Sequence, residues 1–383
     1  MNLLVVRCHE SWRAHPKEGT PTSYMKTSHH KKSKEVLPTK AQLIKLGMDV
    51  HAHFVVVSRQ IDNAHPQPPQ KIKTEDLIPW IQKQLSLAEK VISCYEAGPT
   101  GFWLHRKLEE LGVTNHVICP SKLDSRSKGV SNDKTDADEL LSRLDRFIAG
   151  NTHALSVVRV PTLEEEKKRS RTRLRQQLQQ HRLSLAAQGR TFMLLHGYRQ
   201  SNNWWKSRYW TPLQSTLPEW IVEQLKILKS LIEAVDQQFK EQTKAVEASA
   251  GPERIKGMGP LTSQVIDSEV ADWNRFKNRS QVGSYAGLTG GVASSGQAHA
   301  DLSISKSGNA RLRRAVIELA WRLLAFQGQY WLVQKWKKVL LNPKAHSRRR
   351  KQAIVAFARQ LLIDLWKWKT GRVTPDQLGW QMA

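Results

Sequence analysis

Cysteines and long apolar runs are scarce in this 383-residue sequence. The three cysteines, Cys8, Cys94 and Cys119, are odd in number and far apart, which argues against a disulfide framework or a zinc site. No apolar run approaches the roughly 20 residues that a membrane-spanning helix needs. The opening run Leu3–Val6 is too short for the core of a secretory signal. These absences predict a protein of the reducing cytoplasm without a membrane partner.

Acidic residues are also few relative to basic ones. The chain has 34 Asp and Glu against 60 Lys and Arg, a formal net charge of +26. A balance this basic favours a polyanionic partner, and nucleic acid is the first candidate. The length allows roughly two or three domains.

The first segment, residues 1–40, is poor in apolar side chains and carries several prolines and the basic run His29–Lys34. A segment of this composition cannot bury a core, so it predicts a disordered basic arm. Met25 is an alternative start of translation, in which case the residues before it are not translated.

Residues 41–155 alternate β-rich runs with helical patterns, at a spacing typical of an α/β layer with parallel strand pairs. Two β-rich runs, 43–50 and 54–61, predict a hairpin, and a proline-broken loop follows at Pro66–Pro69. The later predicted elements are a helix over residues 74–89, a strand over 91–95, a helix ending at Leu111 and a strand over 116–119.

Four carboxylates are predicted to lie at the edge where an α/β sheet binds its ligands. Asp49 lies near the end of the first strand and Glu96 directly follows a later one, and strand carboxyl ends form the binding edge of these sheets. Asp133 and Asp136, three residues apart at the start of a predicted helix, share one helical face. Like charges this close repel unless a cation offsets them. Alternatively, Asn132 or Asp133 caps the helix and the acids only complement its dipole.

Together the four acids predict a Mg²⁺ site, because hard divalent cations prefer oxygen ligands and can stabilise both oxygens of a phosphodiester displacement. Acids on strand, strand and helix, in this order, are the pattern of ribonuclease H-like nucleases. A second register is open, with Asp136 and Glu139 as the helix pair. His51 and His53 flank the hairpin turn, where histidines are usually exposed, and they are left out of the site.

Residues 160–250 are helical in pattern, with apolar residues at heptad spacing in both halves. They predict a coiled coil, either an antiparallel helical hairpin or one half of a dimer interface. The basic aromatic cluster Asn202–Trp210 between the halves either stacks on bases or wedges the helix connection. The heptad residues are Leu178, Leu185 and Phe192, then Ile221, Leu225, Leu228, Ile232, Val235 and Phe239.

Residues 251–330 begin with the turn Ile255–Val265, which has the form of a helix-hairpin-helix turn. Its Gly257 and Gly259 would let backbone amides approach a phosphate at the start of the next helix. A glycine- and serine-rich loop is predicted at Gly290–Gln297.

The last segment, residues 331–383, is predicted as a basic helical C-terminal extension. Tryptophans interleave with basic residues there and in the helix before it, and this alternation favours phosphate binding. The cations assigned to nucleic-acid binding are Lys306, Arg311, Arg313 and Arg314.

With these motifs in place, the chain resembles a known family, the DEDD-type insertion-sequence transposases that are bridge-RNA-guided serine recombinases. The resemblance covers roughly residues 43–330, and its ordered landmarks are specific although each is short. They are Gly47–His51, Glu96–Gly101, Asn132–Ala137, Ala286–Thr289, Ser295–Gly296 and Ser305–Arg314.

The resemblance implies an α/β ribonuclease H-like domain followed by a mainly α-helical region, which comprises a coiled-coil insertion and a helical C-terminal transposase domain. It also implies a catalytic serine. By position, Ser295 matches this nucleophile, with Ser294 as the neighbouring alternative. The positions that match the catalytic, metal-binding acids are Asp49, Glu96, Asp133 and Asp136.

The family is expected to join donor and target DNA under a structured noncoding RNA, through a covalent phosphoserine intermediate in a homo-oligomer, a dimer or a tetramer. This implies a prokaryotic, nucleoid-associated protein. The chain departs from the family's usual glutamate loop at Gly98–Pro99.

Two other functions fit the sequence and need no serine nucleophile. The first is a hydrolytic nuclease similar to Holliday-junction resolvases, in which water attacks the phosphodiester. The second is a non-enzymatic RNA- or DNA-binding protein whose acids only cap helices.

Overall fold

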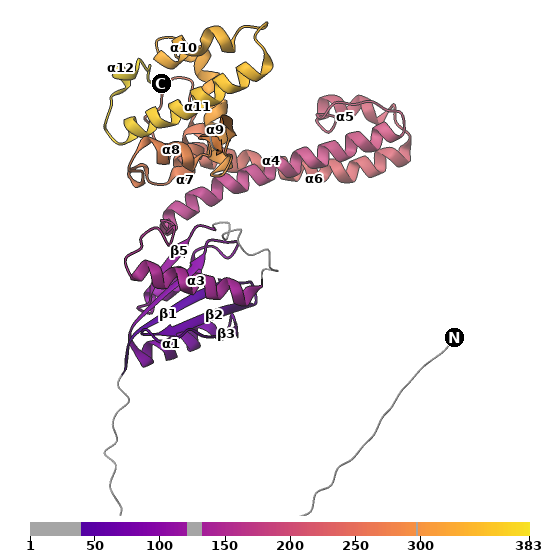
Figure 1. Ribbon diagram of the computed structural model, residues 1–383. Coiled ribbons are helices and arrows are strands. Elements are labelled where there is room, and N and C mark those ends of the chain that lie inside the picture. The colour runs from indigo at the N-terminus through magenta and orange to yellow at the C-terminus, as the bar shows by residue number, and fades with distance from the viewer. Residues whose placement is uncertain (1–39, 121–131, 296–297) are drawn as a thin grey trace, which may run out of the picture. The chain divides into compact units, whose positions relative to one another are not determined.

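The computed structural model describes residues 40–120, 132–295 and 298–383, without the side chains of residues 292–302 (Figure 1). The chain divides between Arg159 and Val160 into two compact units, and each is described by itself. Apart from Lys40, the predicted basic arm of residues 1–40 lies outside the described residues. In the described ranges, no helix is both long and apolar enough to cross a membrane.

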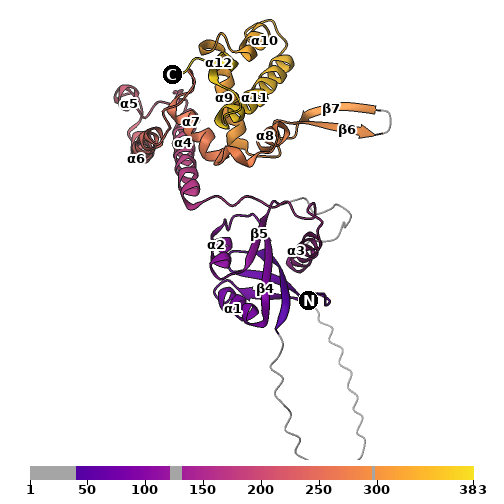
Figure 2. The ribbon, with the colours of Figure 1, turned by 90° about the vertical axis from the view of Figure 1, so that its left-hand side faces the viewer.

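The first unit is built on a five-stranded mixed sheet in the order β3-β2-β1-β4-β5. β1 pairs antiparallel with β2, which pairs antiparallel with β3, whereas β1 with β4 and β4 with β5 are parallel. Figure 2 shows α1 and α2 on one side of the sheet and α3 on the other. The element bounds are β1 Ala41–Val50, β2 Phe54–Ile61, β3 Gln67–Lys73, α1 Leu77–Leu87, β4 Ala88–Glu96, α2 Trp103–Glu110, β5 Thr114–Ile118 and α3 Asp133–Ile148.

The proline-broken loop predicted after the first hairpin is wrong in its second half. Pro68 and Pro69 lie within β3, which in the described part of the chain pairs with β2 alone. An edge strand accepts prolines because its outward backbone groups need no ladder partner. Strand-breaking residues therefore mark the edge of this sheet.

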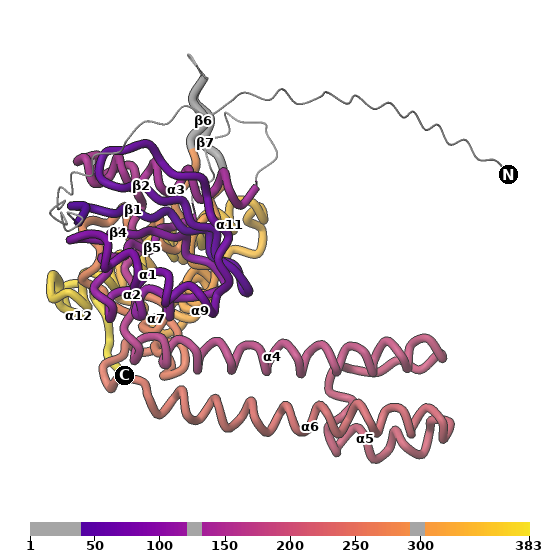
Figure 3. Tube along the Cα trace, turned by 90° about the horizontal axis from the view of Figure 1, so that it is seen from below, coloured from indigo at the N-terminus to yellow at the C-terminus, as the bar shows by residue number. Residues whose placement is uncertain are grey.

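The second unit begins with a helical hairpin of α4 (Leu163–Leu195), α5 (Ser207–Gln214) and α6 (Glu219–Ala248), and Figure 3 shows α4 and α6 side by side. The two long helices run antiparallel, since Arg175 donates to Thr243 and Arg182 bonds Asp236. Of the two predicted arrangements for this segment, the antiparallel hairpin within one chain is the one observed.

The tryptophans between these helices are packed inside the hairpin. Trp204 is fully buried, Trp205 and Trp210 nearly so, and the indole N–H of Trp204 donates to the Ala186 carbonyl. Gly189 leaves room for the Trp204 ring, because a Cβ at that position would lie 2.2 Å from it. These three rings wedge the helix connection and are not available to stack on bases.

The rest of the second unit forms one hydrophobic core whose buried residues run from Ile255 to Trp380. The loop predicted at Gly290–Gln297 is wrong for its first six residues, which form β6 and pair with β7; Gly296 and Gln297 lie outside the described residues. Glycine has low strand propensity, so pairing with the partner strand is what makes this segment a strand.

The remaining elements of the second unit are short helices and the hairpin, followed by longer helices. The prediction of an α/β domain followed by a mainly helical region is confirmed at that level. The bounds are α7 Pro260–Val270, η1 Trp273–Arg275, α8 Arg279–Tyr285, β6 Gly290–Ser295, β7 Ala298–Ile304, α9 Ala310–Phe326, α10 Trp331–Leu340, α11 Ser347–Lys369 and α12 Pro375–Leu378.

Candidate functional site

Asp49 and Glu96 lie at the same edge of the sheet of the first unit. β1 and β4 are parallel neighbours, and their register pairs Met48 with Tyr95. Each acid is one residue beyond that pair, so the two carboxylates belong to adjacent strand ends. This is the edge at which α/β sheets bind ligands.

The first turn of α3 supplies the other two acids. Asn132 caps this helix, because its side chain accepts from the amides of Lys134 and Thr135. Asp133 and Asp136 follow in the first turn, so the cap is made by Asn132 and not by Asp133. Capping therefore accounts for Asn132, whereas the two aspartates in the first turn fit the helix dipole as well as a metal site.

A glycine in β1 allows α3 to lie directly on the sheet. A Cβ added to Gly47 would lie 2.4 Å from the Leu141 nitrogen and 2.5 Å from the Ala137 oxygen. These are backbone atoms, which cannot move without displacing the helix. The close approach brings the α3 aspartates toward the end of β1.

A three-residue cluster forms where β1 and α3 meet. The Nε2 of His51 lies 3.0 Å from Oδ2 of Asp49 and 3.7 Å from Oδ1 of Asp133. One ligand atom from each of the three residues lies within 4.8 Å of the other two. His51 is not among the predicted ligands, although its place two residues after Asp49, directly after the end of β1, is a signal in the sequence.

The acids of the site interact electrostatically. Burial raises the pKa of Asp49; His51 opposes this effect, and the charges of Asp133 and Asp136 add to it. Burial likewise raises the pKa of Glu96, where Arg143 opposes and nearby carboxylates add. Each strand acid is thus raised in pKa by the other acids of the site, as expected for carboxylates that converge.

Glu139, the alternative partner of Asp136, pairs with Arg143, the same cation that opposes the raised pKa of Glu96. The Nη2 of Arg143 donates to Oε1 of Glu139 over 2.5 Å, one turn along α3. This pair satisfies Glu139 without a metal ion.

The donor set of this cluster fits a divalent cation. Carboxylate oxygens suit Mg²⁺ and Mn²⁺, and an imidazole nitrogen widens the choice toward transition metals. Asp49, His51 and Asp133 have side chains that are between about a quarter and half exposed, so solvent and a phosphate can reach them. The residues that could complete such a site are Glu96 and Asp136.

In the second unit, Ser295 is the last residue of β6, and its backbone pairs with Ala298. The base of this hairpin is firmly held. Nη1 of Arg313 donates to the carbonyls of Ala286 and Lys306, and the Ser305 amide donates to Thr289. The Arg313 guanidinium, assigned from sequence to nucleic acid, therefore also binds the backbone that carries the hairpin.

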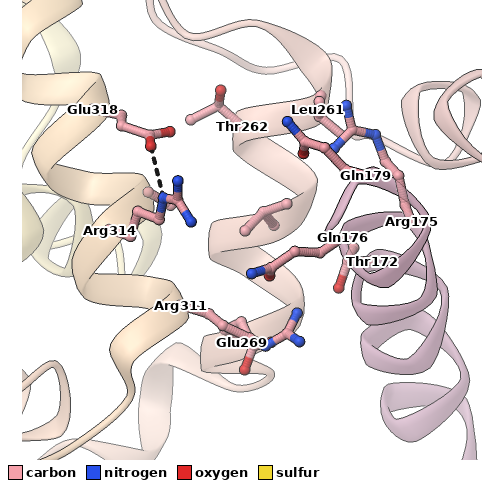
Figure 4. A pocket seen from close by; sticks show the side chains of 12 residues that line it. Thr172, Arg175, Gln176, Gln179, Leu261, Thr262, Glu269, Arg311, Arg314 and Glu318 are labelled. Carbon is pink, nitrogen blue, oxygen red and sulfur yellow. Dashed lines mark hydrogen bonds and ion pairs between the residues drawn. The ribbon is translucent and has the colours of Figure 1, made fainter. Parts of the chain in front are cut away.

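Arg311 and Arg314 line a pocket between α4, α7 and α9 (Figure 4), together with Glu269 and Glu318. Nε of Arg314 donates to Glu318 over 3.0 Å. Burial lowers the pKa of Arg311 and the charge of Glu269 opposes that effect. Both arginines thus face carboxylates, a feature that the basic sequence pattern did not indicate.

Glu269, which the sequence reasoning did not single out, joins three segments of the second unit. Its carboxylate accepts two hydrogen bonds from Arg173 on α4 and one from Asn309, the cap of α9. The Tyr285 hydroxyl donates to its backbone carbonyl over 2.7 Å. The hairpin helix α4 and the segment after β7 are therefore connected through one buried carboxylate.

Gly257 and Gly259 lie in the turn before α7. Gly257 has φ +93°, and a Cβ there would lie 2.9 Å from Phe326. Gly259 precedes Pro260 at the start of α7, and an added Cβ at Gly259 would meet nothing within 4 Å. The space at the Cβ position is therefore open at Gly259 and filled by Phe326 at Gly257.

The sequence is similar to known transposases. The profile of the transposase IS116/IS110/IS902 family matches residues 253–335. A provisionally named transposase, y4rJ of Sinorhizobium fredii (strain NBRC 101917 / NGR234), is 30% identical over 305 residues, which cover 71% of this chain and 75% of that protein.

Two further relatives carry the names of insertion sequences. The transposase for element IS1111A of Coxiella burnetii (strain RSA 493 / Nine Mile phase I) is 24% identical over 310 residues, 77% of this chain and 82% of that protein. The transposase for element IS1533 of Leptospira borgpetersenii is 24% identical over 300 residues, 72% of this chain and 84% of that protein.

Proposed function

The chain belongs to the IS116/IS110/IS902 family of transposases, and from this premise we propose that it cleaves and rejoins DNA strands of an insertion sequence. The observation that carries the proposal is the acidic cluster of the first unit in a chain whose second unit matches the family profile. The substrates are donor and target DNA, and a structured noncoding RNA is the guide.

The first unit is assigned the metal chemistry, as a ribonuclease H-like domain over residues 41–155. Asp49, Glu96 and the α3 aspartates would hold the ion, and the geometry supports the register Asp133 with Asp136 because Asp133 lies in the cluster with Asp49 and His51. When bound, Mg²⁺ would withdraw electron density from the scissile phosphate and stabilise the leaving oxygen.

The second unit is assigned the nucleophile. The Ser295 hydroxyl oxygen forms a bond to phosphorus, the bond to the departing strand's oxygen breaks, and that oxygen takes up the proton that the serine loses. The strand hydroxyl of a second DNA then attacks the phosphoserine and releases the serine. Serine attacks only when it is held against an activated phosphate. The firm base of the β6–β7 hairpin supports such a role.

Replacement of Ser295 by Ala tests the nucleophile directly. With a suicide DNA substrate, the wild type is expected to form a protein–DNA adduct stable to denaturant, and Ser295→Ala is expected to form none while it keeps DNA binding. Ser294→Ala is the matched control, since it removes a hydroxyl one position away. An adduct that persists in Ser295→Ala and is lost in Ser294→Ala assigns the nucleophile to Ser294.

The guide is tested by sequencing the RNA that copurifies with the full chain. One discrete noncoding species supports guided recombination. Bulk cellular RNA indicates attraction by the basic charge alone, which any polyanion satisfies.

A hydrolytic nuclease is the second candidate, and one observation favours it. The Asp49, His51 and Asp133 cluster lies entirely in the first unit, so metal-assisted attack by water needs no residue of the second. This function predicts Mg²⁺-dependent cleavage of branched DNA with free ends and without adduct, unchanged in Ser295→Ala.

A further inference from the structure

A groove of about 530 Å³ lies in the second unit where the base of the β6–β7 hairpin meets α10 and α11. Gly290 and Ser303 line it from the hairpin, and Trp331 and Lys335 from α10. Figure 2 shows the hairpin projecting from the helices beside α8 and α11. The groove is of the size that proteins use for small-molecule and nucleotide ligands.

The charged side chains that line this groove are all cationic. They are Arg279 on α8, Lys335 on α10 and Arg359 on α11, and the described lining residues include no carboxylate. In the described part of the chain, none of the three forms an ion pair. Among the side chains that the structure describes, the groove therefore presents positive charge without a paired acid, unlike the pocket of Arg311 and Arg314, where each arginine faces an acid.

Aromatic faces accompany these cations. Trp331 is 41% exposed, and Trp336 is partly buried at the edge of the core. Nζ of Lys335 lies 6.0 Å from the Trp331 ring centre and 5.3 Å from that of Trp336. A flat indole beside a cation is the combination that binds a base and its phosphate.

The buried acid beneath this region, Asp364, is bound by side chains of the groove and its floor, and Trp331 itself is one of its hydrogen-bond partners. Gln360, which lines the groove, donates to Asp364 over 2.8 Å, and the Tyr330 hydroxyl donates to the same carboxylate over 2.7 Å. Asp364 is nearly inaccessible to solvent. It holds the helices together and does not neutralise the cations at the opening of the groove.

We propose that this groove binds unpaired bases of single-stranded DNA a few nucleotides from the scissile phosphate, a role that rests on the proposed function and deepens it. A duplex keeps its bases stacked inside, so only an unpaired base can reach the Trp331 face. Arg279 and Lys335, which line the same groove, would then bind phosphates of that strand.

We assign DNA and not RNA to the groove because β6, which contributes Gly290 to one wall, also carries Ser295, the proposed nucleophile for DNA. β6 runs from Gly290 at the groove to Ser295, five residues on, which is about 17 Å at about 3.3 Å per residue. A strand whose phosphate meets Ser295 can therefore place its neighbouring unpaired bases in the groove.

The test measures binding of the full chain to a fluorescein-labelled oligothymidylate by anisotropy over a series of salt concentrations. Trp331→Leu is expected to weaken binding roughly tenfold at an unchanged salt slope, because it removes a stacking face and no charge. Lys335→Gln is expected to reduce the slope of log K against log salt by about 0.7, the value for one phosphate contact on a single strand.

Two controls are matched to these variants. Lys337→Gln removes the same charge from α10 two positions away, roughly on the opposite side of the helix. Trp321→Leu removes a tryptophan of similar exposure, 39%, from α9. Both are expected to bind oligothymidylate nearly as the wild type does. Trp331→Phe keeps an aromatic face and is expected to restore most of the affinity that Trp331→Leu loses.

Three outcomes overturn the assignment. Equal losses in Lys335→Gln and Lys337→Gln indicate diffuse charge. If Trp331→Phe and Trp331→Leu lose the same affinity for oligothymidylate, or if both variants lose it because they melt at a lower temperature, Trp331 has a packing role. Tighter binding of oligouridylate, with a larger loss in Trp331→Leu, assigns the groove to RNA.

The groove and the proposed recombinase activity can fail separately. If Ser295→Ala loses the adduct, and Trp331→Leu and Lys335→Gln both bind oligothymidylate as the wild type does, only the groove assignment is wrong. Weakened oligothymidylate binding in the groove variants, without any adduct in the wild type, leaves the groove as a single-strand site and removes the serine mechanism.

Discussion

The buried Glu269 carboxylate illustrates how one residue acts in the second unit. Its side chain is 1% exposed and accepts hydrogen bonds from Arg173 and Asn309. Burial raises its pKa, but these bonds and the arginine charges outweigh burial, so the pKa lies below its ordinary value of 4.5. We expect Glu269→Gln to lower the free energy of unfolding by about 2 kcal/mol, because a hydrogen bond to a charged group is lost in a buried place.

The sign of the pH dependence follows from that lowered pKa. A group whose folded pKa is depressed contributes stability above its unfolded pKa, and this contribution is lost as pH falls through the folded value. The melting temperature of the wild type should therefore approach that of Glu269→Gln below about pH 4.5. Glu318→Gln, whose Arg314 pair is exposed, is the control and should change the melting temperature little. A Glu269→Gln difference that stays constant down to pH 3 would contradict the prediction.

The acidic cluster depends on the packing of α3 against β1, and a substitution at Gly47, where the two elements touch, tests this dependence. Gly47→Ala places a Cβ 2.4 Å from the α3 backbone, so either α3 shifts or the sheet distorts. We expect a loss of about 3 kcal/mol in unfolding free energy. We also expect weaker Mn²⁺ binding by calorimetry, although no ligand is changed.

The control for this prediction lies in the same unit. An added Cβ at Gly98 meets no atom closer than 3.9 Å, so Gly98→Ala should keep both stability and metal affinity. Asp49→Asn should lose Mn²⁺ binding without the loss of stability. If Gly47→Ala binds Mn²⁺ as the wild type does, the position of α3 does not control the cluster.

The whole chain consists of two units with separate hydrophobic cores. Residues around Ile92 and Leu144 form one, and residues from Ile255 to Trp380 form another. We expect residues 40–159 and 160–383, expressed separately, each to unfold cooperatively by circular dichroism, because each buries its own apolar surface. The first fragment should bind Mn²⁺ and the second oligothymidylate, whereas neither alone should transfer strands.

This prediction has a sharp contrary outcome. If residues 40–159 fold and bind no Mn²⁺ while the full chain does, a ligand comes from residues 160–383. A matched fragment that carries Asp49→Asn shows which part of any binding is nonspecific.

The features that the sequence alone could predict are those set by neighbouring residues. Strand runs such as 54–61 and the placement of Asp49 and Glu96 at strand ends follow from short-range pattern, and the structure has them there. The sequence predicted a helix cap at Asn132 or Asp133, and in the structure the cap is Asn132. The catalytic and metal roles of these acids, and of Ser295, stay predictions.

The sequence by itself determined the division into an α/β part and a mainly helical part, the basic charge and the spacing of the acids, since each follows from neighbouring residues and their period. Only the tertiary structure decided that His51 joins Asp49 and Asp133, that Gly290–Ser295 is a strand, and that Arg311 and Arg314 face acids. These features arise from contacts between residues far apart in the chain. Such contacts are set by strand pairing and helix packing, and no local pattern encodes them.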